Sequence, residues 1–101
     1  GVIGMTKTWA KEFARKGVPV RVNAIAPGFF SSKQNQKLLW NEDGTPTART
    51  KKILAGTPMG RFGRTEELAG GLLFLLDDDA AGFITGIVLP VDGGFSAYGG
   101  V

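Results

Sequence analysis

The sequence predicts an α/β fold with a parallel sheet, because helix and strand patterns alternate along it. Residues 2–16 repeat apolar side chains at three- and four-residue steps, which is typical of an amphipathic helix. Residues 20–26 and 87–91 are short apolar runs rich in β-branched residues, as expected of buried strands. Residues 68–76 are apolar on nearly all sides and predict a buried helix. A helix followed by a short turn and a strand favours a parallel sheet.

Turn-forming residues mark the expected ends of these elements. Gly17 fits the C-terminal stop of the first helix, and the Pro-Gly pair at residues 27–28 ends the first strand. Thr65 is a candidate cap for the second helix, and the two glycines at residues 70–71 suggest a close backbone approach there. The aspartates at residues 77–79 fit caps or turns, because three adjacent carboxylates cannot all face one metal ion.

Missing residue types exclude several classes of site. The 101 residues contain no cysteine and no histidine, which excludes disulfides, thiolate chemistry, His-containing triads and His-rich zinc sites within them. The net charge is +3 and the basic residues are dispersed, so the pI near 9.5 is only weak support for a nucleic-acid interface. No apolar run is long enough to span a bilayer, and no signal-peptide pattern is present. We expect no metal, nucleic-acid or membrane partner.

The segment between the first strand and the second helix has no sustained periodicity. Within it, residues 31–40 and 48–54 each predict a short helix, separated by Gly44 and Pro46. A long irregular excursion inside a compact domain is usually a functional lid or a disordered segment.

Four segments carry a resemblance to a known family. They are residues 1–6, 21–28, 58–69 and 84–94, which contain the runs GVIGMT, RVNAIAPG, PMGRFG with EELA, and ITG with VDGG. In this order and spacing they resemble the C-terminal part of the short-chain dehydrogenases/reductases. The resemblance implies the C-terminal portion of a Rossmann-type, doubly wound parallel sheet. Residues 1–101 would form part of one domain, with residues 29–60 as an inserted substrate lid.

A narrower resemblance involves residues 35–62 and the Phe-Ser-Ala-Tyr run at residues 95–98. Both are similar to bacterial D-mannonate oxidoreductases, also called fructuronate reductases. This similarity implies reversible reduction of a 5-keto uronic acid by NADH. The family implies NAD or NADP as cofactor, a small carbonyl or sugar-acid substrate, a cytoplasmic location and a homotetramer or dimer. The apolar faces of residues 2–16 and 87–91 are the expected subunit contacts.

The family's catalytic Ser, Tyr and Lys have no counterpart in this sequence. Tyr98 is the only tyrosine, and the residues Gly-Gly-Val follow it in place of the family's Tyr-x-x-x-Lys spacing. The resemblance therefore predicts these catalytic residues upstream of residue 1 and predicts that the 101 residues alone are inactive. A different class stays open, namely a non-catalytic fragment that acts only in binding or oligomerisation. Against it, two strands do not make a stable parallel sheet alone.

The resemblance also implies which residues contact the cofactor. It places Pro27, Gly28, Phe29 and Phe30 against the nicotinamide, where backbone groups would fix the carboxamide. Ser32 stands where the family often has a threonine five residues after the proline, and it keeps the hydroxyl. The fold pattern agrees, because ligands bind outside the carboxyl ends of parallel strands.

Candidate substrate contacts lie in the predicted lid and just after it. They are Gln34, Asn35, Trp40, Arg49 and Arg61. A carboxylated substrate favours an arginine, because a guanidinium and a carboxylate form a bidentate pair. The sequence does not choose between the two arginines, which can also be structural, and its position favours the tryptophan as a packing residue of the lid over a substrate contact.

Overall fold

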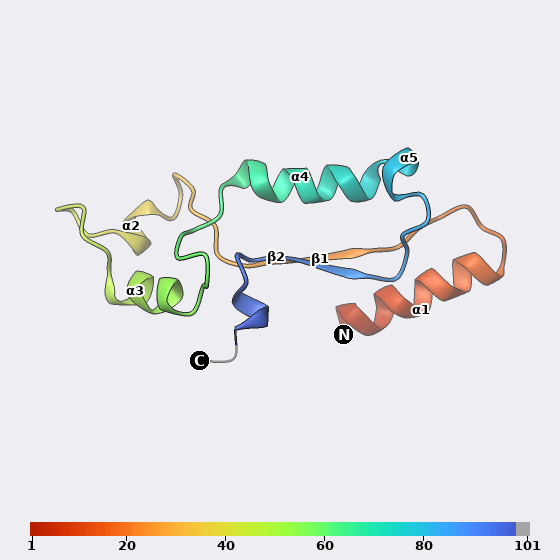
Figure 1. Ribbon diagram of the computed structural model, residues 1–101, viewed down its shortest axis with the longest axis horizontal. Coiled ribbons are helices and arrows are strands. Elements are labelled where there is room, and N and C mark those ends of the chain that lie inside the picture. Colours follow the sequence, from red (N-terminus) through yellow and green to blue (C-terminus); the bar gives the residue numbers. More distant parts are fainter. Residues whose placement is uncertain (99–101) are drawn as a thin grey trace. The chain divides into compact units, whose positions relative to one another are not determined.

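The computed structural model describes residues 1–98 (Figure 1). The elements are α1 (Val2–Arg15), β1 (Ala24–Pro27), α2 (Gln36–Leu39), α3 (Ala48–Ala55), α4 (Thr65–Leu76), α5 (Asp78–Ala81), β2 (Val88–Val91) and the short 3-10 helix η1 (Phe95–Ala97). They form two compact units. The first unit contains Gly1–Ala26 and Ala69–Pro90, and the second contains Pro27–Leu68 and the described residues from Val91 onward.

Helix α1 matches the predicted first helix and ends as expected at a glycine. Gly17 has a φ of 70°, in the left-handed region that glycine adopts without strain. The N–H of Val18 donates to the carbonyl of Phe13 at 2.9 Å, and the N–H of Gly17 donates to that of Ala14 at 3.2 Å. These two bonds are the Schellman pattern, which satisfies carbonyls left free at a helix C-terminus.

Strands β1 and β2 pair in parallel, as predicted. The N–H of Ala24 donates to the carbonyl of Ile87 at 3.0 Å, and the N–H of Gly28 donates to that of Val91 at 2.9 Å. Between these two bonds, both strands advance by the same number of residues in the same direction, which defines a parallel register. Parallel neighbours need a long crossover connection, and residues 29–87 supply it.

Strand β1 begins later than the sequence predicts. Residues 20–23 lie outside it. One backbone bond joins the two segments there, from the N–H of Gly86 to the carbonyl of Val22 at 2.7 Å, and side chains supply other bonds. The N–H of Val22 donates to the Oγ1 of Thr85 at 3.0 Å, and the Nδ2 of Asn23 donates to the carbonyl of Ile84 at 3.1 Å. These bonds align the residues before the two strands and so set the register that the strands continue.

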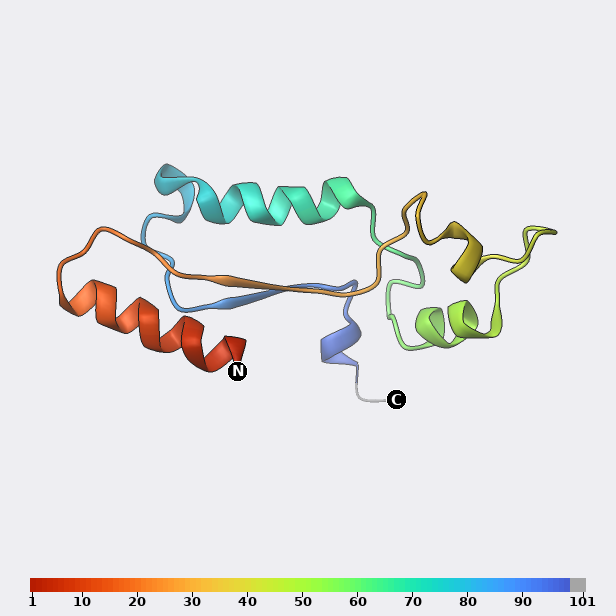
Figure 2. The ribbon, with the colours of Figure 1, turned by 180° about the vertical axis from the view of Figure 1, so that it is seen from behind.

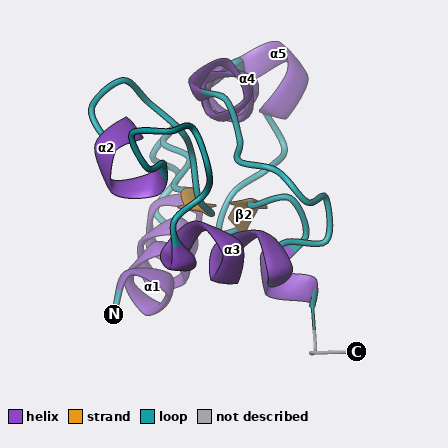
Figure 3. Cartoon of the chain, turned by 90° about the vertical axis from the view of Figure 1, so that its left-hand side faces the viewer, coloured by secondary structure: helices purple, strands orange, loops and turns teal. Residues whose placement is uncertain are grey.

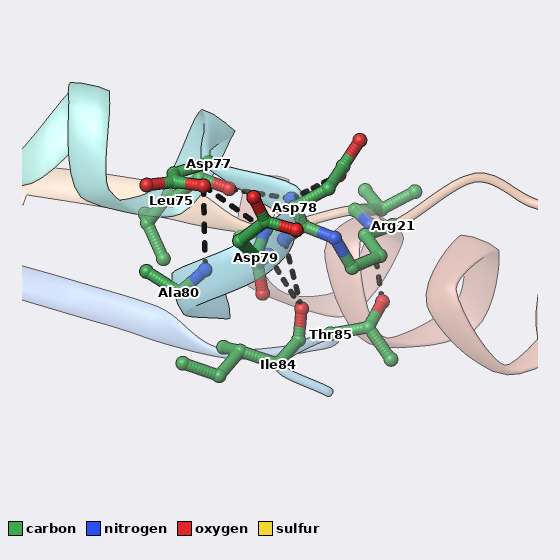
Figure 4. Close-up of polar contacts among 10 residues, drawn as sticks. Arg21, Leu75, Asp77, Asp78, Asp79, Ala80, Ile84 and Thr85 are labelled. Atoms are coloured by element: carbon green, nitrogen blue, oxygen red, sulfur yellow. Dashed lines mark hydrogen bonds and ion pairs between the residues drawn. The ribbon is translucent and has the colours of Figure 1, made fainter. Parts of the chain in front are cut away.

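Arg21 ties three parts of the first unit together (Figure 4). Its guanidinium donates to the carbonyl of Leu75 at 2.8 Å, to the carbonyl of Ile84 at 3.2 Å and to the Oδ1 of Asp78 at 2.9 Å. The Leu75 carbonyl belongs to the last turn of α4, where carbonyls lack helical partners and a positive charge is favourable. Arg21 therefore caps α4 from the segment before β1.

Helix α4 is less buried than its sequence predicts. Leu72, Leu73 and Leu76 are 49%, 66% and 65% exposed, and within the described residues of this helix only Leu75 is buried. In the first unit, α1 and the residues of α4 from Ala69 onward lie on opposite faces of the strand pair (Figures 1 and 2). Two strands are too narrow to cover a helix that is apolar all round. Apart from its own helix and its chain neighbours, nothing among residues 1–98 lies within 4 Å of a Cβ built on Gly70, so these residues make no close approach to Gly70.

Figure 3 shows the short helices α2 and α3 of the second unit, and hydrogen bonds join the last residue of α2 to the start of α3. Thr47 caps α3 by accepting a hydrogen bond from the N–H of Thr50 at 3.3 Å. The Leu39 carbonyl at the end of α2 accepts from the Oγ1 of Thr47 at 3.1 Å and from that of the fully buried Thr50 at 2.5 Å.

Among residues 1–98, no helix is both long and apolar enough to cross a bilayer.

Candidate functional site

The loop at residues 27–32 starts at the carboxyl end of β1 and lies directly against the turn after β2. A Cβ built on Gly28 would lie 2.7 Å from both the Cα and the Cβ of Asp92. The N–H of Gly28 also donates to the carbonyl of Val91 at 2.9 Å. Because a backbone atom of the neighbour cannot rotate away, only glycine fits this contact. The Pro-Gly pair predicted as a strand end is therefore also a site of close backbone packing.

The turn after β2 is fixed by Asp92. Its carboxylate accepts hydrogen bonds from the N–H of Gly94 and the N–H of Ser96, both at 3.0 Å. Hydrogen bonds from the side chain and backbone of Ser96 hold the pKa of Asp92 below its usual range. Gly93 and Gly94 both have positive φ, and the Gly93 carbonyl accepts from the N–H of Met59 at 3.0 Å. The predicted Asp-Gly-Gly turn is thus held in shape by Asp92 and is hydrogen-bonded to the backbone of Met59.

Gly63 holds the middle of the loop after β1. The Phe29 carbonyl accepts from the N–H of Gly63 at 3.0 Å, and the N–H of Ser31 donates to the Gly63 carbonyl at 3.2 Å. The two bonds make an isolated parallel bridge between Phe30 and Gly63. A side chain at position 63 would run into the Phe30 ring. The absence of a side chain at this position therefore lets the Phe30 ring lie close to the Gly63 backbone.

Asn35 closes the far end of the same loop. Its Nδ2 donates to the Phe30 carbonyl at 2.8 Å, and its Oδ1 accepts from the N–H of Ser32 at 2.9 Å. Both ends of the Asn35 amide are thus engaged in loop closure, so this residue positions the loop instead of offering free groups to a ligand. Four donors of the loop remain without a partner among residues 1–98, namely the N–H groups of Phe29 and Phe30 and the hydroxyls of Ser31 and Ser32.

A cavity of about 130 Å³ brings together residues predicted for the cofactor and for the substrate. Its lining residues are Phe29, Phe30, Asn35, Leu38, Leu39, Arg49, Ile53 and Phe62. Phe29 also packs edge to face on Phe95, with ring centroids 5.3 Å apart. The structure therefore places the predicted substrate residue Arg49 beside two of the predicted nicotinamide contacts.

Trp40 lines a different hollow of about 560 Å³. The other residues of that hollow are Ser31, Gln36, Asn41, Glu42, Gly44 and Phe62. Phe62 borders both hollows and packs edge to face on Trp40 at a centroid distance of 6.3 Å. Gln34 is exposed and lines neither hollow. Of the predicted substrate residues, Asn35 and Arg49 therefore line one hollow, Trp40 lines the other, and Gln34 lines neither.

Arg61 lines neither hollow, and its guanidinium is paired. It forms a bidentate contact with Glu67, with nitrogen–oxygen distances of 2.7 and 2.9 Å. Glu67 also accepts from the N–H of Arg64 at 2.9 Å, which is the capping-box contact of a glutamate in the first turn of a helix. Helix α4 begins at Thr65 itself, so Thr65 is not its cap and Glu67 supplies this contact. The sequence signal was a glutamate three residues after Arg64.

Replacing Glu67 by glutamine should flatten the acid dependence of unfolding. Hydrogen bonds from Arg61, with one from the Arg64 N–H, lower the pKa of Glu67 from 4.5 to about 2. A group whose pKa is depressed by folding stabilises the folded state above its unfolded pKa, and this is lost as pH falls toward the folded pKa. Glu67→Gln should therefore remove a stability increment that the unaltered protein loses between about pH 4.5 and 2.

The measurement is the thermal unfolding midpoint of the intact protein across that pH range. Glu66→Gln is the matched control, because it makes the same charge change one residue earlier without the bidentate contact. Equal effects of the two substitutions would show that net charge, and not the Arg61 pair, sets the dependence.

Comparison with known proteins identifies the family to which this chain belongs. The family model described as enoyl-(acyl carrier protein) reductase matches residues 1–96. An uncharacterised oxidoreductase from Bacillus subtilis is 60% identical over 96 residues, covering 95% of this chain and 34% of that protein. The crystal structure of a proposed D-mannonate oxidoreductase from Haemophilus influenzae with bound NAD is 55% identical with a TM-score of 0.88. That match covers 99% of this chain and 35% of that one.

A second solved structure agrees. It is a proposed 2-deoxy-D-gluconate 3-dehydrogenase from Agrobacterium tumefaciens with bound NADP, 42% identical with a TM-score of 0.77, covering 96% of this chain and 36% of that one. The chain thus spans about a third of the length of the relatives it matches. These likenesses confirm the Rossmann-type α/β fold class with its parallel strands. The chain belongs to the short-chain dehydrogenase/reductase family of oxidoreductases.

Proposed function

We propose that the intact protein is an NAD- or NADP-dependent oxidoreductase that transfers a hydride between the nicotinamide and a carbonyl or hydroxyl group of a small substrate. The observation that carries this proposal is the loop at residues 27–32. Its backbone is fixed by Asp92, Gly63 and Asn35, while four of its donors, including the N–H groups of Phe29 and Phe30 and the Ser32 hydroxyl, have no partner among residues 1–98. The loop follows the carboxyl end of β1, where ligands of parallel α/β sheets bind.

The free donors suit the carboxamide of a nicotinamide. The N–H groups of Phe29 and Phe30 and the hydroxyl of Ser32 are neutral donors, and a carboxamide oxygen accepts such bonds. A loop that is fixed before binding presents its donors at little ordering cost. In this proposal Pro27 and Gly28 shape the loop, and the carboxamide contacts decide which nicotinamide face meets the substrate. The bound cofactor supplies the hydride chemistry.

The proposed substrate is a sugar acid, specifically the pair D-mannonate and D-fructuronate. The Haemophilus influenzae relative is described as a proposed D-mannonate oxidoreductase, and the Agrobacterium tumefaciens relative as a proposed 2-deoxy-D-gluconate 3-dehydrogenase. Both named substrates carry a carboxylate and several hydroxyl groups. Residues 29–60 would form the substrate lid, with Trp40 facing the hydroxyl-bearing carbon chain. A substrate contact by Gln34, which lines neither hollow, stays a prediction.

No proton-donating residue is assigned within residues 1–98. Reduction of a ketone needs a donor for the developing alkoxide. We propose that the family's catalytic Ser, Tyr and Lys supply it from elsewhere in the intact protein, with residues 1–101 forming part of a single Rossmann-type domain. A homo-oligomer of such domains also stays a prediction.

The experiment is a cofactor oxidation assay on the intact protein. With NADH or NADPH and D-fructuronate we expect loss of the reduced-cofactor absorbance, and with NAD or NADP and D-mannonate we expect its appearance. A reaction without the sugar acid is the control for background oxidation. If a panel of ketones and sugar acids gives no turnover with either cofactor, the proposal is wrong.

A further inference from the structure

The two candidate arginines of the second unit have different surroundings. Arg61 already forms a bidentate pair with Glu67 at 2.7 and 2.9 Å. Arg49 makes no ion pair and no side-chain hydrogen bond with any of the residues that the structure describes. A guanidinium fork binds one carboxylate in its bidentate geometry, so Arg61 would have to leave Glu67 in order to bind another.

Arg49 borders the cavity of about 130 Å³ and is the charged residue in its lining. Most of the lining is aromatic or aliphatic, and the other polar side chain, Asn35, uses both ends of its amide on the loop backbone. Small-molecule sites are typically apolar with a few placed polar groups that fix the ligand's orientation. Arg49 is thus the group of this cavity with donors to offer.

The backbone that carries Arg49 is held in place. Arg49 is the second residue of α3 and comes two residues after the Thr47 cap. The buried Thr50 hydroxyl ties the same turn to the Leu39 carbonyl at 2.5 Å. The Arg49 side chain is itself exposed, so a ligand can reach it from solvent. A fixed backbone with a reachable guanidinium is what recognition of an external carboxylate requires.

On the basis of the proposed function, we infer that Arg49 binds the substrate carboxylate and makes the protein select sugar acids over neutral sugars. Arg61 instead holds the first turn of α4 through Glu67. The cavity places the bound carboxylate on the side of Phe29 and Phe30, the residues proposed to contact the nicotinamide. The rest of a sugar acid then extends from this anchor toward the reacting carbon.

The experiment compares a charged ligand with its neutral match. D-mannonate and D-mannonamide are titrated by calorimetry into the intact protein saturated with the reduced cofactor, which cannot accept a hydride from either ligand. Arg49→Gln should weaken D-mannonate binding roughly 10- to 100-fold, the range expected for hydrogen bonds to a charged group. D-mannonamide binding should change less than about threefold, because an exposed neutral contact contributes little. Arg49→Lys should keep part of the affinity as a point charge without the fork.

Two control variants separate Arg49 from general charge and from folding. Lys51→Gln removes the same charge from the same helix at an exposed position outside the cavity lining, and the ratio of acid to amide affinity should not change. Arg61→Gln should lower the unfolding temperature through loss of the Glu67 pair and leave that ratio unchanged.

The inference is overturned if Arg49→Gln weakens both ligands equally, or if Lys51→Gln reproduces its effect. Turnover of neutral ketones without preference for the acid would also overturn it, while leaving the oxidoreductase proposal standing. If the protein neither binds nor oxidises the cofactor, the proposed function fails. The two ligands are then titrated without cofactor, and selective loss of D-mannonate binding in Arg49→Gln still supports a carboxylate site, whereas equal binding overturns it.

Discussion

Replacing Gly28 by alanine is expected to destabilise the intact protein by about 1–3 kcal/mol, the usual cost of inserting a methyl group into closely packed surroundings. The added Cβ would lie 2.7 Å from the Cα of Asp92 and 3.2 Å from its carbonyl oxygen. These are main-chain atoms, so relief requires the loop and the turn after β2 to separate. That movement also strains the bond from the Gly28 N–H to the Val91 carbonyl.

The same substitution should weaken NAD or NADP binding, since the loop carries the proposed carboxamide contacts. The measurements are urea unfolding and cofactor titration of the intact protein. Gly70→Ala is the matched control: nothing described lies within 4 Å of its Cβ, and the change should stabilise α4 by up to about 1 kcal/mol. If Gly28→Ala destabilises no more than Gly70→Ala and leaves cofactor binding intact, the role given to the loop is wrong.

Replacing Arg21 by methionine should cost about 2–4 kcal/mol of stability, because hydrogen bonds from a charged donor contribute about 1.5–3 kcal/mol each. The substitution keeps the apolar stem and removes the donors that reach the Leu75 and Ile84 carbonyls at 2.8 and 3.2 Å. Asp78 adds little, because its side chain is 90% exposed. The C-terminal turn of α4 loses its cap.

Denaturant unfolding of the intact protein measures this loss. Arg15→Met is the control, because it removes an exposed arginine from α1 with no ion pair among residues 1–98. Similar midpoints for the two variants would contradict the assignment of Arg21 as a cap. A loss confined to Arg21→Met would support it.

Local patterns predicted most of the helices and strands of this chain. The spacing of apolar residues located α1 and β2, and Gly17 marked the end of α1 as its φ of 70° requires. The start of β1 was predicted too early, because whether residues 20–23 join a ladder depends on distant side chains such as Thr85. Helix α4 is less buried in this chain than its hydropathy predicts, because hydropathy does not state how much neighbouring surface these residues supply.

The sequence predicts the types of residue in the candidate site better than it predicts which of them lie together in space. Gly28 and Gly70 look alike in the sequence, and only the distant Asp92 shows which of them needs to be glycine. Arg49 and Arg61 were likewise equivalent until the Glu67 pair separated them. Contacts between residues far apart in sequence decide such cases, and periodicity carries no information on them.

The tie made by Arg21 has an evolutionary consequence. Two of its three acceptors are main-chain carbonyls, at positions 75 and 84. Every amino acid, proline included, presents that same oxygen. Mutational drift at these two positions therefore leaves the acceptors in place so long as the backbone path persists. The donor side has no such tolerance, since no other side chain offers a planar fork with five N–H groups. Selection on this junction should fall almost wholly on the arginine.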